Sequence, residues 1–175
     1  YVSWLPLYHD LGLVGTCLTA LFADANLYLI SPFDYLRDPM LWLRTISEVR
    51  GTVTCAPDFA LRQVARHSGN RSLGDLDLRC LRRLVCGGEP VRATSIRSFS
   101  QALATTGFDW RSIAPSYGLA ESTVYVATSA RPEGARRLVV DRSDLVQHGT
   151  VQVVDAGAVL GSEAPTGPRL TEVVA

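Results

Sequence analysis

The chain has 175 residues, a length that fits one domain or a large piece of one. Apolar residues make up 47% of it, which is enough for a buried core and excludes a disordered chain. The formal net charge is zero, so the composition gives no electrostatic support for a nucleic-acid partner. All 17 basic residues are arginine, so these residues alone cannot complete a mechanism that needs a lysine.

The predicted elements alternate along the chain between short strands and helices. From apolar periodicity we expect strands at residues 1–4, 26–31, 52–55, 84–86 and 111–114. We expect helices at residues 11–23, 39–49, 57–67 and 92–104. The first of these helices is apolar on all sides and is expected to be fully buried. The alternation predicts an α/β fold with a mostly parallel sheet and crossover helices.

The last quarter of the chain differs in character from the rest. Residues 1–130 are predicted to form the core of the domain. Residues 131–175 continue the same domain as a polar, arginine-bearing segment, either a small β-rich insertion or an irregular surface segment. The chain opens at Tyr1 on a strand-like segment without an initiator methionine, so we expect the natural protein to extend upstream.

Neither a disulfide framework nor a membrane span is predicted. The four cysteines stand in apolar surroundings with no CxxC spacing, which is typical of free thiols in a reducing compartment and favours a cytoplasmic protein. The longest apolar stretch, Leu11–Ile30, is interrupted by Asp24 and Asn26 and is too short to cross a bilayer.

Three turns after predicted strands are the candidate ligand-binding segments, because parallel sheets bind ligands at the carboxyl ends of their strands. They are residues 5–10, 86–91 and 115–123. In the third turn, Tyr117 can offer its ring to a planar base, and Gly118 lets the backbone approach a ligand closely. Glu121 is a lone carboxylate of the kind that a hard cation on phosphates prefers, or else an acid that caps backbone amides.

The other two turns carry less specific signals. Gly87 and Gly88 allow close approach of the backbone to a ligand, and Pro90 begins the next helix, but an ordinary strand-to-helix turn has the same pattern. His9 and Asp10 stand side by side, and His9 could bind a carboxylate substrate or a phosphate, or serve a structural role. Neither a phosphate-binding glycine motif nor a GxSxG nucleophile elbow is present in the chain.

Together, in this order, the three turns resemble the adenylate-forming superfamily of acyl-CoA synthetases, luciferases and nonribosomal adenylation domains. The resemblance rests on SWLPLYHDLGL (residues 3–13), CGGEPVR (residues 86–92) and YGLAEST (residues 117–123). Within the superfamily the sequence is most similar to the mycobacterial type of fatty acyl-AMP ligase. The resemblance implies an internal fragment of the large N-terminal domain of an enzyme that uses ATP and Mg²⁺. That enzyme would activate a fatty acid as acyl-AMP for an acyl carrier protein of a polyketide synthase.

The resemblance also implies roles for individual residues. Glu121 would hold the magnesium ion, and His9 would lie near the acyl carboxylate and the α-phosphate. Tyr117 would stack on adenine, within a nucleotide-binding set of Gly87, Gly88, Glu89, Pro90, Ser116, Tyr117, Gly118, Leu119, Ala120 and Glu121. The acyl pocket would comprise His9, Asp10, Gly12, Leu13 and Phe59.

Two features favour an acyl-AMP ligase over relatives that form acyl-CoA. Ala120 replaces the threonine that many CoA-forming relatives carry. Residues 131–154 fall where acyl-AMP ligases carry an insertion associated with not using coenzyme A. The superfamily's lysines lie in an upstream phosphate loop and a C-terminal domain, so this piece alone is expected to be inactive.

Three alternatives stay open at this stage. One is a long-chain fatty acyl-CoA synthetase, which shares the first half-reaction. Another is a nonribosomal adenylation domain, in which Asp10 or Asp58 would hold the α-amino group of an amino acid. The third is an inactive truncated remnant that keeps part of a nucleotide cleft.

Overall fold

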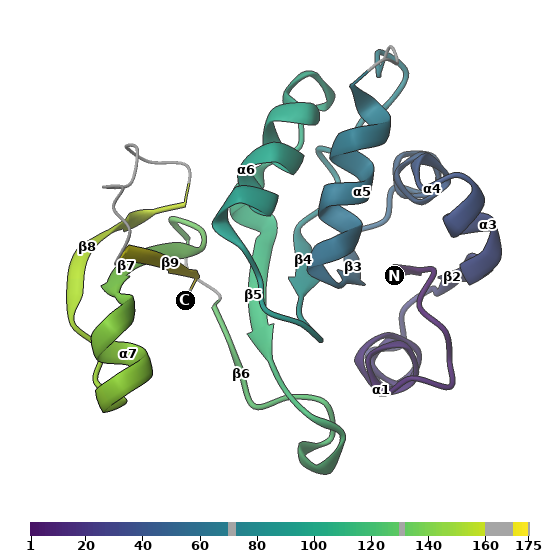
Figure 1. The fold of residues 1–175 in the computed structure, drawn as a ribbon. Coiled ribbons are helices and arrows are strands. Elements are labelled where there is room, and N and C mark those ends of the chain that lie inside the picture. Colours follow the sequence, from purple (N-terminus) through teal and green to yellow (C-terminus); the bar gives the residue numbers. More distant parts are fainter. Residues whose placement is uncertain (70–72, 130–131, 160–169, 175) are drawn as a thin grey trace.

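The computed structural model describes residues 1–69, 73–129, 132–159 and 170–174, which contain two sheets (Figure 1). The larger sheet has the strand order β2-β1-β3-β4-β5-β6, in which β1 to β5 run parallel and β6 is antiparallel to β5. Its strands are β1 (Val2–Ser3), β2 (Tyr28–Leu29), β3 (Val53–Ala56), β4 (Arg83–Cys86), β5 (Ile113–Tyr117) and β6 (Ala127–Thr128). The predicted α/β class with a mostly parallel sheet is therefore confirmed.

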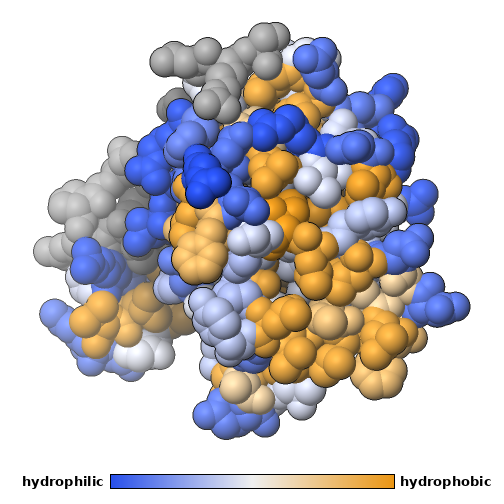
Figure 2. Space-filling view, turned by 90° about the vertical axis from the view of Figure 1, so that its right-hand side faces the viewer, coloured by the Kyte–Doolittle hydropathy of each residue, from blue (hydrophilic) through white to orange (hydrophobic). Residues whose placement is uncertain are grey.

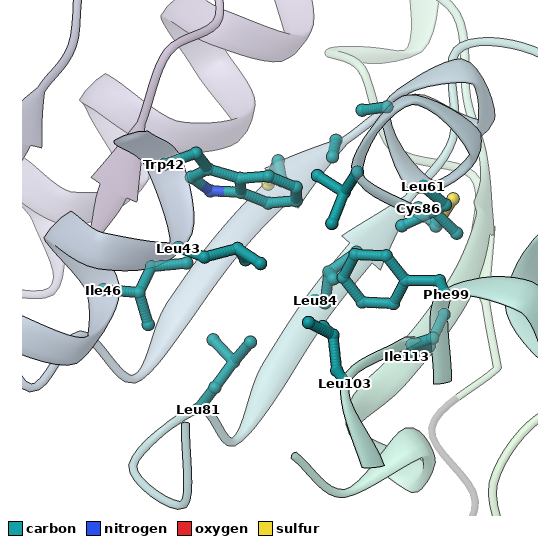
Figure 3. Close-up of a cluster of buried hydrophobic side chains, with 14 of the residues drawn as sticks. Trp42, Leu43, Ile46, Leu61, Leu81, Leu84, Cys86, Phe99, Leu103 and Ile113 are labelled. Carbon is teal, nitrogen blue, oxygen red and sulfur yellow. The ribbon is translucent and has the colours of Figure 1, made fainter. Parts of the chain in front are cut away.

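Helices α4 (Met40–Val49), α5 (Asp58–Ser68) and α6 (Ala93–Ala102) lie close to their predicted positions. Figure 1 shows α5 and α6 packed side by side over the sheet. The core lies between these helices and the strands, where Figure 3 shows Trp42, Leu84, Phe99 and Ile113 in one cluster. The Trp42 indole N–H donates to Thr54 Oγ1 at 3.0 Å, so this large buried ring also satisfies its polar atom.

The first predicted helix is present but is not fully buried. It consists of α1 (Asp10–Gly12), a π-helical segment (Leu13–Leu18) and α2 (Thr19–Phe22). Thr16 and Ala20 are buried, whereas Leu21 and Phe22 are 72% and 87% exposed, so the expectation of complete burial was wrong. The segment lies beside the sheet rather than between two layers, so only one side of it meets other described residues (Figure 1).

A further helix, α3 (Pro32–Arg37), was not predicted. Its Ser31 side chain accepts a hydrogen bond from the Phe33 amide and Pro32 occupies its first position, which is a common helix start. Figure 2 shows that apolar side chains gather on the face bearing the first helical segments. The exposed large apolar residues of these segments include Leu21, Phe22, Phe33 and Leu36, and Tyr28 of β2 is exposed as well.

The last part of the chain is β-rich, one of the two forms expected for it. Strands β7 (Arg136–Asp141), β8 (Val153–Ala158) and β9 (Leu170–Val174) form an antiparallel sheet in the order β8-β7-β9. Helix α7 (Arg142–His148) follows β7 and is capped by Asp141, which accepts from the Ser143 and Asp144 amides. Strand β9 contacts α6. The predicted division of the chain at residue 130 stays a prediction.

None of the helices in the described ranges combines the length and the apolar character that a membrane span requires.

Candidate functional site

All three candidate turns contribute to one cavity of about 560 Å³, which we name the central cavity. Its lining includes His9 and Asp10 from the first turn, Gly87 and Gly88 from the second, and Tyr117 from the third. These turns are far apart in the sequence and meet because β1, β4 and β5 run in the same direction in one sheet.

Two further cavities adjoin the second turn. The apolar cavity, of about 430 Å³, is lined by Trp4, Leu5, Leu36, Phe59 and residues 87–89, among others. The outer cavity, of about 850 Å³, is lined by Gly88, Pro90, Ser116, Tyr117, Thr128 and neighbouring residues. Gly88 lines all three cavities, and His9 lines both the central and the apolar one. The second turn therefore separates an apolar space from a more polar one.

The glycine pair in the second turn is required by the local geometry. A Cβ atom at position 87 would lie 2.6 Å from the Ser116 carbonyl oxygen, so a side chain there would push β4 and β5 apart. Gly88 has a φ of +82°, a conformation that residues with side chains rarely adopt. The glycines therefore bring the backbone of two neighbouring strands together at the edge of the cavities.

The Glu89 side chain is directed toward α5. Its Oε1 accepts a hydrogen bond of 2.6 Å from the Phe59 amide, while the residue also lines the outer and apolar cavities. Phe59 in turn lines the apolar cavity and makes an edge-to-face contact with the Trp4 ring. The second turn and the wall of the apolar cavity are thus directly hydrogen-bonded to each other.

The third turn divides into a part within the cavities and a part outside them. Ser116, Tyr117 and Gly118 line both the central and the outer cavity, and Tyr117 is 65% exposed. Glu121 is exposed in a short 3₁₀ turn (Ala120–Ser122) and lines none of the three cavities. The same holds for the exposed Leu119 and Ala120.

His9 and Asp10 contact each other although they are adjacent in the sequence. The His9 Nδ1 atom lies 2.8 Å from Asp10 Oδ1, and that oxygen also accepts a 2.7 Å hydrogen bond from the Leu11 amide. The Leu11 amide also donates to His9 Nδ1 at 3.2 Å, so the His9 side chain caps the start of α1. The sequence had not indicated that Asp10 orients His9.

The remaining residues of the predicted acyl pocket are dispersed. Asp10 lines the central cavity and Phe59 the apolar one. Gly12 lines none of the three cavities and packs on the first turn, where a Cβ atom would lie 2.3 Å from the Pro6 carbonyl oxygen. Leu13 is 41% exposed and also lies outside their lining.

Sequence reasoning missed Arg83, which lines the central cavity from within β4. Ligand-binding residues were expected only in the turns after strands. The alternation in β4 carries the missing signal, because Leu84 and Cys86 are buried on one face and Arg83 must point to the other. Thr128 of β6 was also missed; it lines the outer cavity, and its hydroxyl lies 2.6 Å from that of Ser116.

The cysteines are free thiols, as predicted. Desolvation raises the pKa of the buried Cys55 thiol to about 12. Burial also raises the pKa of Cys86, and the nearby negative charge of Asp58 adds to the effect. Both thiols are therefore neutral and poorly reactive at pH 7. Among the residues whose placement is described, no group of three His, Cys, Asp or Glu side chains could hold a metal ion.

Comparisons with known proteins identify the family and the fold of the chain. The family model of AMP-binding enzymes matches residues 1–165, and the chain belongs to that family. It is 35% identical over 160 residues to the long-chain-fatty-acid–AMP ligase FadD32 of Mycolicibacterium smegmatis, covering 89% of this chain and 25% of the relative.

Two crystal structures from Legionella pneumophila share the fold. A fatty acid AMP ligase superposes with a TM-score of 0.85 at 28% identity, covering 99% of this chain and 28% of the other. A fatty acyl-adenylate ligase in complex with acyl adenylate and pyrophosphate gives a TM-score of 0.83, also at 28% identity, covering 99% of this chain and 29% of the other. The chain therefore spans about a quarter of the length of the curated relative and of these structures.

Proposed function

We propose that this chain forms part of the catalytic domain of an ATP-dependent fatty acyl-AMP ligase. The observation that carries the proposal is the convergence of the three motif-bearing turns on the central cavity, with an apolar cavity directly beside it. A ligand that joins a nucleotide to an acyl chain needs adjoining polar and apolar spaces, and Gly88 lines both.

In this proposal the nucleotide lies between the second and third turns. The Tyr117 ring, which is largely exposed, would stack on adenine, and residues 87–90 would line its edge. Ser116 and Gly118 would contact the same ligand from the end of β5. Leu119, Ala120 and Glu121 would contribute from the 3₁₀ turn that follows.

The acyl chain would lie in the apolar cavity against Phe59. His9 lines both this cavity and the central one, so it would stand near the junction of the acyl carboxylate and the α-phosphate. Asp10 would hold the His9 ring through Nδ1. Gly12 and Leu13 would support this wall indirectly, since they lie outside the three cavities.

The reaction forms one bond and breaks one. A fatty-acid carboxylate oxygen attacks the α-phosphorus of ATP, and the bond from that phosphorus to the bridging oxygen of pyrophosphate breaks. Both reactants are anions, so positioning and charge neutralisation dominate the barrier. When bound, Mg²⁺ would neutralise phosphate charge. Glu121 would supply one oxygen ligand, which fits an ion that retains several waters and phosphate oxygens.

The acceptor of the acyl group would be an acyl carrier protein of a polyketide synthase. Ala120 supports this choice, as does the polar segment at residues 131–154, where the described part contains β7, α7 and part of β8. Deleting residues 131–154 from the full-length protein should then increase acyl-CoA formation. Unchanged acyl-CoA formation would remove the support that this segment provides.

The proposal is tested by ATP–pyrophosphate exchange on the full-length protein with fatty acids of increasing length. We expect exchange with fatty acids and none with amino acids; exchange with amino acids alone would contradict the proposal. Product analysis with coenzyme A or a carrier protein then separates an acyl-AMP ligase from an acyl-CoA synthetase. The 175-residue chain alone should give no exchange, because it contains no lysine.

A further inference from the structure

Asp58, at the start of α5, is a completely buried carboxylate with partners in another helix. Its Oδ1 accepts a 2.9 Å hydrogen bond from the Arg92 amide, and its Oδ2 accepts a 3.0 Å hydrogen bond from the Ser95 hydroxyl. It also pairs with Arg62 one turn along α5. A buried charge is stable only when its oxygens are satisfied, so these partners are held in fixed places around it.

The contact with Arg92 supplies a cap that α6 otherwise lacks. Arg92 is the N-cap residue of α6, and its own side chain makes no capping hydrogen bond. Asp58, which lies 34 positions earlier in the chain, instead accepts from the backbone N–H of this N-cap residue. It thereby ties the end of the second turn, where α6 begins, to the start of α5.

The second turn in return provides a hydrogen-bond acceptor at the start of α5. Its N-cap residue is Pro57, which makes no side-chain capping hydrogen bond, and the Phe59 amide instead donates to Glu89. Helix α6 is therefore bound at its start by an acid of α5, and α5 by an acid of the second turn that leads into α6. We name this pair of interactions, Asp58 with Arg92 and Glu89 with Phe59, the reciprocal cap.

We infer that Asp58 and Glu89 are positioning residues that hold the second turn in register with the wall of the apolar cavity. Gly88, which lines all three cavities, directly precedes Glu89 in the sequence. Phe59, which lines the apolar cavity, donates the hydrogen bond that Glu89 accepts. The reciprocal cap thus sets the separation between the nucleotide side and the acyl side of the site. The kinetic part of this inference rests on the proposed function.

The kinetic test uses Glu89→Ala, Glu89→Gln, Asp58→Ala and Asp58→Asn in the full-length protein, assayed by ATP–pyrophosphate exchange. We expect both alanine variants to raise the KM for ATP and for the fatty acid together, lowering each kcat/KM by roughly tenfold. The conservative variants keep an oxygen acceptor for the Phe59 or Arg92 amide, so they should recover most of the loss.

Asp38 provides a matched control. It accepts from the Met40 amide at the start of α4 and pairs with Arg44, so it is also an acid that caps a helix, but the cap is local and Asp38 lines none of the three cavities. Asp38→Ala should lower stability and leave both KM values unchanged. If Asp58→Ala and Glu89→Ala behave like Asp38→Ala, the reciprocal cap is only structural and the inference is wrong.

A second readout does not depend on turnover. Amide hydrogen exchange on the full-length protein should be faster at Phe59 in Glu89→Ala and at Arg92 in Asp58→Ala, and it should be restored by Gln and Asn. If the wild-type protein shows no ATP–pyrophosphate exchange with fatty acids, the proposed function fails. Calorimetric ATP affinity in the same variants then replaces KM, and unchanged affinity together with unchanged amide exchange would overturn the reciprocal cap.

Discussion

The turns that follow the neighbouring strands β4 and β5 are built in opposite ways. The turn after β4 is fixed to α5 by two hydrogen bonds, one from Arg92 to Asp58 and one from Phe59 to its own Glu89, and it fits tightly against β5. The turn after β5 carries exposed side chains and contains two non-glycine residues, Thr123 and Val124, with φ of +58° and +67°. Positive φ is strained for β-branched residues, and such strain concentrates at functional sites.

The two turns therefore have different roles in the proposed site. The β4 turn is a fixed wall whose position depends on α5 and α6, so substitutions there act through geometry. The β5 turn exposes the side chains of Tyr117 and Glu121, so substitutions of these two residues should act on the ligand and leave the fold intact. Gly118 is the exception within the β5 turn, because a Cβ atom added there would clash with the backbone.

Gly118→Ala should have the largest effect. A Cβ atom at this position would lie 1.8 Å from the Val124 carbonyl oxygen, so the backbone of the β5 turn must shift. We expect a loss of about 3 kcal/mol in the free energy of unfolding, measured by urea denaturation, and loss of ATP binding. Gly69→Ala is the control, because the nearest atom to its added Cβ lies 3.8 Å away. Equal stability of the two variants would contradict the close packing at Gly118.

Glu121→Gln should reduce the rate of adenylation by about a hundredfold while leaving stability unchanged, because the side chain is exposed and its proposed role is to bind magnesium. The measurement is ATP–pyrophosphate exchange in the full-length protein over a range of Mg²⁺ concentrations. Glu48→Gln, an exposed acid of α4, should leave the rate unchanged. A normal rate for Glu121→Gln would exclude this carboxylate from the metal site.

Tyr117→Ala should raise the KM for ATP about tenfold, the usual scale for losing one stacking interaction with a base. Tyr117→Phe keeps the aromatic ring and should behave like the wild type. The stability of both variants should stay near that of the wild type, since Tyr117 is 65% exposed. A similar rise in KM for both would show that the hydroxyl group, not the ring, contacts the nucleotide.

The buried thiols should produce the smallest effect, seen in the pH dependence of stability. Burial raises the pKa of Cys55 from 9.0 to about 12, so the folded state holds this proton while the unfolded state releases it above pH 9. The contribution of this thiol is therefore complete below pH 9 and is lost as pH rises toward 12. At pH 9.5 the loss is about 1 kcal/mol, and Cys55→Ala should remove it. An unchanged pH dependence in Cys55→Ala would show that Cys55 is not the source.

Much of the fold could be predicted because it follows from local periodicity. The spacing of Leu61 and Val64 marks one face of α5, and β-branched residues mark β3. The exposure of Leu21 and Phe22 could not be predicted, because an apolar sequence does not tell whether other elements cover both sides of a helix. Helix α3 was missed because Pro32, which directly follows the strand expected at residues 26–31, begins a helix.

The site was only partly predictable for a related reason. Glycine pairs and a strand-end tyrosine are local signals, and they indicated the turns that meet at the central cavity. The capping of α6 by Asp58 joins residues 34 positions apart, and no local pattern indicates it. That Glu121 lies outside the three cavities likewise depends on how the β5 turn folds, which its composition does not determine.

The most direct measurement is a crystal structure of the full-length protein with a non-hydrolysable acyl-adenylate analogue. The account predicts adenine between the Tyr117 ring and residues 87–90, with the acyl chain passing His9 toward Phe59. An adenine bound away from both the β4 and the β5 turns would contradict it.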